Sequence, residues 1–169
     1  MDVASLRVHR RDKDEIFRGH HSPLRPGARS AFEGLVYYDP DPGFVYRLEI
    51  EQAASETITV EASDGDERIH KRVGTVTFDV GGVAASLALY DTGHPGLFLP
   101  FRDATSGNET YGAGRYLDLE PNDDGTLTID FNLAYNPLCA YNETYSCPLA
   151  PVENWLSVPI RAGERAYVG

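Results

Sequence analysis

Between residues 32 and 90 the chain alternates apolar and polar residues with the two-residue period of β-strands. Strands rich in Val, Thr, Phe and Tyr are expected at residues 32–38, 44–51, 57–62, 68–80 and 83–90. Turn-forming Pro, Gly and Asp separate these strands at residues 39–43, 63–66 and 81–82. Because strands joined by tight turns pair antiparallel, the pattern predicts a mainly β fold, an antiparallel sandwich or a flattened barrel.

The N-terminal segment follows another pattern. Residues 3–17 are mostly charged and carry apolar residues near both ends, at Val3, Leu6, Ile16 and Phe17. This segment predicts a helix that ends at Gly19 and packs on the rest of the protein as an N-terminal helical arm. A loop is expected at residues 20–27, since Pro and Gly do not continue a helix.

Beyond about residue 93 the alternation gives way to an irregular sequence that is dense in polar and aromatic residues. Strands are expected from Arg115 to Leu119 and over residues 127–131, with a hairpin turn at 123–125. The rest is predicted to be a long irregular C-terminal region. No repeat or linker divides the chain, which predicts one domain over residues 1–169, formed by an arm (1–31), an antiparallel meander (32–92) and a motif-rich half (93–169).

The charge balance limits the classes of partner. The chain has a net charge of −11 and an isoelectric point near 4.8, which disfavours nucleic acid because the protein would repel the phosphates. Lys13 and Lys71 are the only lysines among many acidic residues, a composition typical of halophilic proteins. An ordinary acidic protein is the alternative interpretation.

The distribution of apolar residues also bears on location. No segment has the ~18 or more consecutive apolar residues that a membrane span requires, so no membrane partner is expected. The first residues lack the apolar stretch of a secretory signal. The sequence therefore predicts a cytoplasmic protein.

Short motifs in both halves connect the chain with a known family. In the second half these motifs are FRDATSG (101–107), TYGAGRYL (110–117), DFN (130–132), AYNP (134–137), CAY (139–141), CPL (147–149) and EN (153–154). The upstream segments SPL (22–24) and FEGL (32–35) also match. With these motifs the chain resembles an archaeal and bacterial family named domain of unknown function 1684. The resemblance implies kinship and no particular activity; Ala150 departs from a position that is usually Pro.

The motif-rich half is also where a ligand site is expected, because ionisable, amide and aromatic side chains interleave there as they do in pockets. The preferred hypothesis is a small-molecule binding domain whose arginines hold an anionic ligand and whose tyrosines form walls. The candidate residues are Arg102, Tyr111, Arg115, Tyr116, Asp130, Asn132, Tyr135, Asn136, Glu153 and Asn154. The structural alternative is that Arg102 pairs with Asp103 or Asp118 and the loop between the arginines is only surface.

Two other functions stay open. In a hydrolase or lyase, Glu153 or Asp130 is the general base and Arg115 stabilises developing negative charge. Alternatively Glu153 forms a salt bridge to Arg102 or Arg115 and braces a loop. In a structural or interaction protein the polar network is a scaffold, and the working surface lies elsewhere. The sequence specifies no oligomeric state.

Cys139 and Cys147 are the two cysteines, with seven residues between them. They are interpreted as buried small hydrophobes, as a disulfide or redox pair, or as metal ligands, and these alternatives stay open. No complete metal or cofactor motif is present: the acidic run at 120–131 lacks the final Glu of an EF-hand, and the Gly-x-Gly at 112–114 lacks a dinucleotide-binding context. No metal and no cofactor are therefore predicted.

Overall fold

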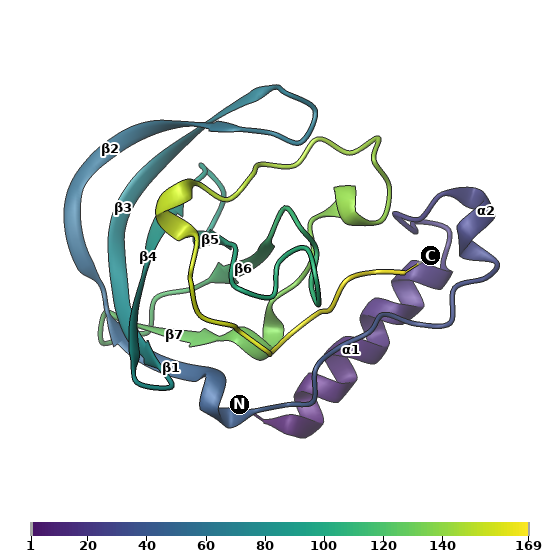
Figure 1. Cartoon of the computed structure of the whole chain (residues 1–169), viewed down its shortest axis with the longest axis horizontal. Coiled ribbons are helices and arrows are strands. Elements are labelled where there is room, and N and C mark those ends of the chain that lie inside the picture. Colours follow the sequence, from purple (N-terminus) through teal and green to yellow (C-terminus); the bar gives the residue numbers. More distant parts are fainter. Residues whose placement is uncertain (1, 169) are drawn as a thin grey trace.

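The structure is a computed structural model that describes residues 2–168. Two antiparallel sheets lie beside helix α1 (Figure 1). The larger sheet has the strand order β2 (Glu51–Glu61), β3 (Glu67–Val80), β4 (Val83–Asp91), β5 (Leu97–Phe101) and β6 (Arg115–Leu119), and the smaller sheet pairs β1 (Val45–Glu49) with β7 (Thr126–Asp130). The helical segments are α1 (Val3–Arg18), α2 (Pro26–Arg29) and the 3-10 helices η1 (Pro42–Phe44), η2 (Phe131–Leu133), η3 (Leu138–Ala140) and η4 (Val152–Asn154).

The predicted mainly β fold is confirmed, and the meander is clearest from β2 to β4. Glu61 lies opposite Glu67 and Val80 opposite Val83, so the turns at 63–66 and 81–82 connect strands as expected. The β2–β3 pairing and the β3–β4 pairing each contain one register shift. These shifts accompany the strong curvature of β2 and β3 in Figure 1. Neither sheet closes into a barrel within residues 2–168, so the flattened-barrel form of the prediction does not apply.

The main core lies between the two sheets and the C-terminal segment. Alternate residues of β4 and β7 point into it, as the two-residue period requires. The fully buried members include Leu87, Leu89, Leu127, Ile129 and Ile160. Burial of each such side chain contributes on the order of 1.5–3 kcal/mol, so this cluster is the principal source of stability.

Helix α1 forms the predicted N-terminal helical arm, and it packs against its own chain. Asp2 caps it by accepting hydrogen bonds from the N–H groups of Ala4 and Ser5, and Gly19 ends it. Leu6 and Phe17 are the buried residues of the helix. None of the helices within residues 2–168 has both the length and the apolar character needed to cross a membrane.

Two predicted strand features are wrong. Residues 32–38 form no strand but an extended segment with one isolated bridge, Tyr37 to Glu164, because Phe32 and Leu35 pack against the helical arm in a second cluster. The turn at 123–125 forms, but β7 pairs with β1 and not with β6, the strand before it in the sequence. Only an isolated bridge between Pro121 and Leu127 remains of the expected hairpin among the described residues.

Candidate functional site

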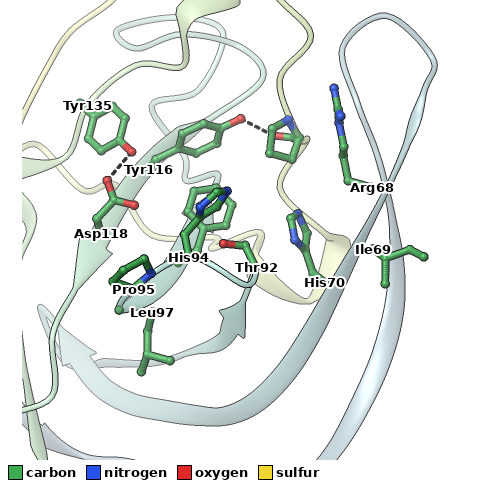
Figure 2. A pocket seen from close by; sticks show the side chains of 13 residues that line it. Arg68, Ile69, His70, Thr92, His94, Pro95, Leu97, Tyr116, Asp118 and Tyr135 are labelled. Carbon is green, nitrogen blue, oxygen red and sulfur yellow. Dashed lines mark hydrogen bonds between the residues drawn. The ribbon is translucent and has the colours of Figure 1, made fainter.

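The strongest candidate site is a surface pocket of about 580 Å³ beside the start of β3. It lies between β3, the loop that joins β4 to β5, and β6 (Figure 2). Pockets that hold small molecules have volumes of roughly 300–1,000 Å³, so this one is large enough for a compact organic ligand. Its lining combines Arg68, His70 and His94 with Phe98 and the polar aromatic residues described below.

His70 is the most informative residue of the lining. The alternation of β3 places Arg68 and His70 on one face, while Ile69 between them is 74% exposed and points away (Figure 2). The imidazole is 6% exposed and packs against the rings of Tyr90 and Phe98, at centroid distances of 6.1 and 5.8 Å. Neither ring nitrogen has a hydrogen-bond partner within residues 2–168. A buried polar group normally has one, so the imidazole lacks hydrogen bonds that such a group usually makes.

Burial lowers the pKa of His70, and the nearby positive charge of Arg68 lowers it further. A neutral imidazole therefore predominates near pH 7. In that form one ring nitrogen donates a hydrogen bond and the other accepts one. His70 can thus recognise a polar group of a ligand without carrying a charge, while Arg68 supplies the positive charge beside it.

The facing wall is aromatic and already hydrogen-bonded. The Tyr135 hydroxyl donates to Asp118 Oδ2 at 2.6 Å, and the Tyr116 hydroxyl donates to the carbonyl of Pro148 (Figure 2). Phe98 and Tyr116 meet edge to face with centroids 4.8 Å apart. Burial raises the pKa of both tyrosines, so their hydroxyls stay protonated. This wall offers ring faces and edges to a planar ligand.

Of the ten residues expected to form one pocket, Tyr116 and Tyr135 line this one. Arg115 lies instead in the interior, 1% exposed, with Nη2 2.8 Å from Asp103 Oδ2. The same guanidinium donates to the carbonyls of Ile160, Ala162 and Glu164. With its donors directed to these groups, Arg115 ties the C-terminal segment to β6.

The three candidate asparagines are buried braces between segments. Asn154 pairs with the backbone of Ala88 in both directions and donates to the carbonyl of Pro100. Asn132 joins Asp41 to Asp130 in a similar way. Asn136 donates through its side chain to the carbonyl of Arg165. Each amide thereby joins its own segment to the backbone of a segment far away in the sequence.

The candidate carboxylate bases also lie away from the pocket lining. Glu153 accepts a hydrogen bond from the Tyr90 hydroxyl at 2.6 Å and lies 3.2 Å from Arg72 Nε, which corrects the expected salt bridge to Arg102 or Arg115. Asp130 accepts hydrogen bonds from the backbone and side chain of its near neighbour Asn132.

Arg102 corrects the second expected ion pair. Its guanidinium stacks on the ring of Trp155, 4.3 Å from the ring centroid, and does not pair with Asp103 or Asp118. Such a cation–π contact contributes about 0.5–1 kcal/mol at an exposed site. Arg102 thus covers an exposed indole at the surface.

Cys139 and Cys147 are both buried, lie side by side and form no disulfide in the structure. The Cys139 N–H donates to Cys147 Sγ at 3.3 Å, and the Tyr111 hydroxyl donates to Cys139 Sγ at 3.6 Å. Hydrogen bonding with the Cys147 thiol, and then with Tyr111, lowers the pKa of Cys139 to about 6, while the pKa of Cys147 is raised. Within residues 2–168 no group of three or more His, Cys, Asp or Glu side chains could hold a metal ion.

Reasoning from the sequence did not select Arg68, His70 or Asp118 as a ligand site, although one signal was available. An arginine and a histidine two residues apart in a strand share a face. The burial of the carboxylates of Asp103 and Glu164 was not predicted either, since an acidic residue in the sequence gives no sign of burial.

Comparison with known proteins places the chain in a family. No curated protein matches it. The solution NMR structure of an uncharacterized protein from Haloarcula marismortui is similar, with a TM-score of 0.74 and 40% sequence identity over 96% of this chain and 92% of that chain. The family model described as "Protein of unknown function (DUF1684)" matches residues 30–165. The chain therefore belongs to the DUF1684 family.

Proposed function

We propose that this protein binds a small organic anion with a planar, apolar body in the pocket between β3 and β6. The observation that carries the proposal is the buried imidazole of His70, whose two ring nitrogens lack protein partners within residues 2–168. Desolvating such a group without a hydrogen bond costs about 1–3 kcal/mol. A ligand that supplies the missing hydrogen bonds would recover this cost.

The local charge supports an anionic ligand despite the overall net charge of −11. Arg68 supplies a positive charge to the lining, and the single carboxylate of the lining, Asp118, accepts a hydrogen bond from the Tyr135 hydroxyl. Arg68 also donates to Ser146 Oγ at 2.9 Å, which restrains its side chain. The aromatic wall opposite suits the planar body of the ligand.

Binding is favoured over the carboxylate-base enzyme because Glu153 and Asp130 are both hydrogen-bonded outside the lining. The composition additionally supports a working environment of concentrated salt, and the Haloarcula marismortui relative points the same way.

The test is an NMR titration of the isotope-labelled protein with benzoate and phenyl phosphate, and with neutral benzamide as the matched uncharged probe. The anions should shift the imidazole nitrogens of His70 and the amides of His94, Gly96, Leu97 and Phe98, and benzamide should bind more weakly. Arg68→Gln should weaken benzoate binding roughly tenfold, equivalent to about 1.4 kcal/mol, because a charge-assisted hydrogen bond is lost.

His70→Phe should also weaken binding, since the replacement keeps the aromatic packing and removes both ring nitrogens. The control is Arg47→Gln, which removes an exposed arginine that pairs with Asp124 away from the pocket. An equal loss of affinity in Arg68→Gln and Arg47→Gln, or no pocket shifts with either anion, would refute the proposal.

A further inference from the structure

We propose that Cys139 and Cys147 form a dithiol site that a hydroperoxide oxidises reversibly to a disulfide, and that this change alters the pocket wall through Pro148. Formation of the disulfide is independent of the proposed ligand. The consequence for ligand binding rests on the proposed function.

The geometry brings the two sulfurs together. The Cys139 N–H donates to Cys147 Sγ at 3.3 Å, so the second sulfur already lies against the backbone of the first residue. A disulfide needs Cβ atoms about 3.8 Å apart, so the loop between the two cysteines adjusts when the bond forms. Residues 139 and 147 bound such a loop, which begins in the short helix η3.

The environment makes Cys139 the attacking thiol. It lines a second hollow of about 310 Å³, together with Arg25 and Tyr141, through which a small oxidant can reach it. The Tyr111 hydroxyl donates to its sulfur at 3.6 Å and stabilises the thiolate. With a pKa of about 6, Cys139 is largely thiolate at pH 7, whereas Cys147 stays protonated because its pKa is raised.

The chemistry balances with hydrogen peroxide as oxidant. The Cys139 thiolate attacks one peroxide oxygen, the O–O bond breaks, and a sulfenic acid and hydroxide form. The Cys147 sulfur then attacks the sulfenic sulfur and the S–O bond breaks, so the oxygen leaves as water with the thiol proton. Overall, two thiols lose two hydrogens and one peroxide becomes two waters. A dithiol reductant reverses the change by thiol–disulfide exchange.

Contacts next to Cys147 link this site to the pocket. Ser63 donates its N–H to the Cys147 carbonyl at 2.8 Å, and its hydroxyl accepts the Cys147 N–H at 3.1 Å. The next residue, Pro148, lines the pocket and accepts the Tyr116 hydroxyl. Movement of the Cys147 sulfur into a covalent bond therefore acts on Pro148 and Tyr116, the wall that faces His70.

The first test is mass spectrometry of the denatured, unalkylated protein after treatment of the reduced full chain with hydrogen peroxide. We expect a product lighter by two hydrogens that returns to the starting mass with dithiothreitol. Cys147→Ser should instead accumulate a sulfenic acid that dimedone traps, whereas Cys139→Ser should react far more slowly. The rate should fall as the pH falls below about 6, because the Cys139 thiolate is lost, and Tyr111→Phe should slow it by weakening thiolate stabilisation.

Oxidation of either cysteine to sulfinic acid without the two-hydrogen product would overturn the dithiol site, as would equal reactivity of the two serine variants. The second test compares NMR signals of Tyr116 and His70 in the reduced and oxidised proteins without ligand. Unchanged signals would overturn the link to the pocket. This readout does not need benzoate, so failure of the proposed ligand class and failure of the link give different results.

Discussion

Asp103 joins three parts of the chain through one buried carboxylate. Its Oδ2 accepts hydrogen bonds from Arg115 Nη2 at 2.8 Å and from the N–H of Ile160 at 3.0 Å, and its Oδ1 accepts from the N–H of Thr105 at 2.8 Å. The charged side chains of Asp103 and Arg115 are both almost fully buried. A buried ion pair adds little stability relative to apolar residues, but removal of one partner leaves the other charge without compensation.

We therefore expect Asp103→Asn to lower the free energy of unfolding by about 3–5 kcal/mol, because Arg115 keeps its charge inside the protein. The control is Glu109→Gln, since Glu109 pairs with the exposed Arg161 and such pairs contribute below about 1 kcal/mol. Equilibrium unfolding in urea at pH 7 measures both. Similar losses in the two variants would mean that the buried pair is not a brace.

At the scale of elements, helix α1 is attached by one face. Phe17 contacts Tyr141 edge to face at a centroid distance of 4.8 Å and lies 5.6 Å from Phe32. Lys13, in the middle of the helix, pairs with the buried carboxylate of Glu164, which also accepts the Tyr141 hydroxyl at 2.5 Å. The helix therefore covers the segment at 32–38 and holds the C-terminal segment in place.

Neighbouring residues of the helix give a matched pair of variants. Phe17→Ala should cost about 3–5 kcal/mol of unfolding free energy, because it leaves a cavity in the second cluster. Ile16→Ala should change it by less than about 0.5 kcal/mol, since Ile16 is 57% exposed. Urea unfolding followed by circular dichroism distinguishes them. If Phe17→Ala were as stable as Ile16→Ala, the helix would not be packed as described.

At the scale of the whole molecule, negative charge is spread over the surface, and in places it is concentrated. Glu61 and Glu67 are directly opposite in the β2–β3 hairpin, where like charges destabilise pairing. With a net charge of −11, the folded chain repels itself more at low salt. Screening shortens from about 10 Å at 0.1 M salt to about 3 Å at 1 M.

We expect the melting temperature to rise by roughly 10 °C between 0.1 and 2 M KCl, a shift equivalent to a few kcal/mol for a chain of this size. The double variant Glu61→Gln, Glu67→Gln should melt higher at 0.1 M KCl and show a smaller rise. Differential scanning calorimetry provides both values. An unchanged melting temperature across this range would count against adaptation to concentrated salt.

The sequence by itself determined the features that arise between near neighbours in the chain. The period of two specified β3, β4 and the second half of β2, which begins at Glu51 and not at residue 57. The turn residues specified the connections, and Gly19 marked the end of α1. These signals are local, because side-chain alternation and turn geometry depend on residues a few positions apart. The resemblance to the family also came directly from the residues, and the family match over residues 30–165 confirmed it.

Only the tertiary structure decided which polar residues hydrogen-bond other segments in the interior and which line the pocket. Glu153 forms an ion pair with Arg72, and the guanidinium of Arg115 donates hydrogen bonds to the carbonyls of Ile160, Ala162 and Glu164. Residues 32–38, although patterned as a strand, packed on the helical arm instead. Each outcome depends on partners tens of residues away, so no local pattern could specify it. His70 became a candidate for ligand binding for the same reason: the fold buried its imidazole without giving its nitrogens a partner within residues 2–168.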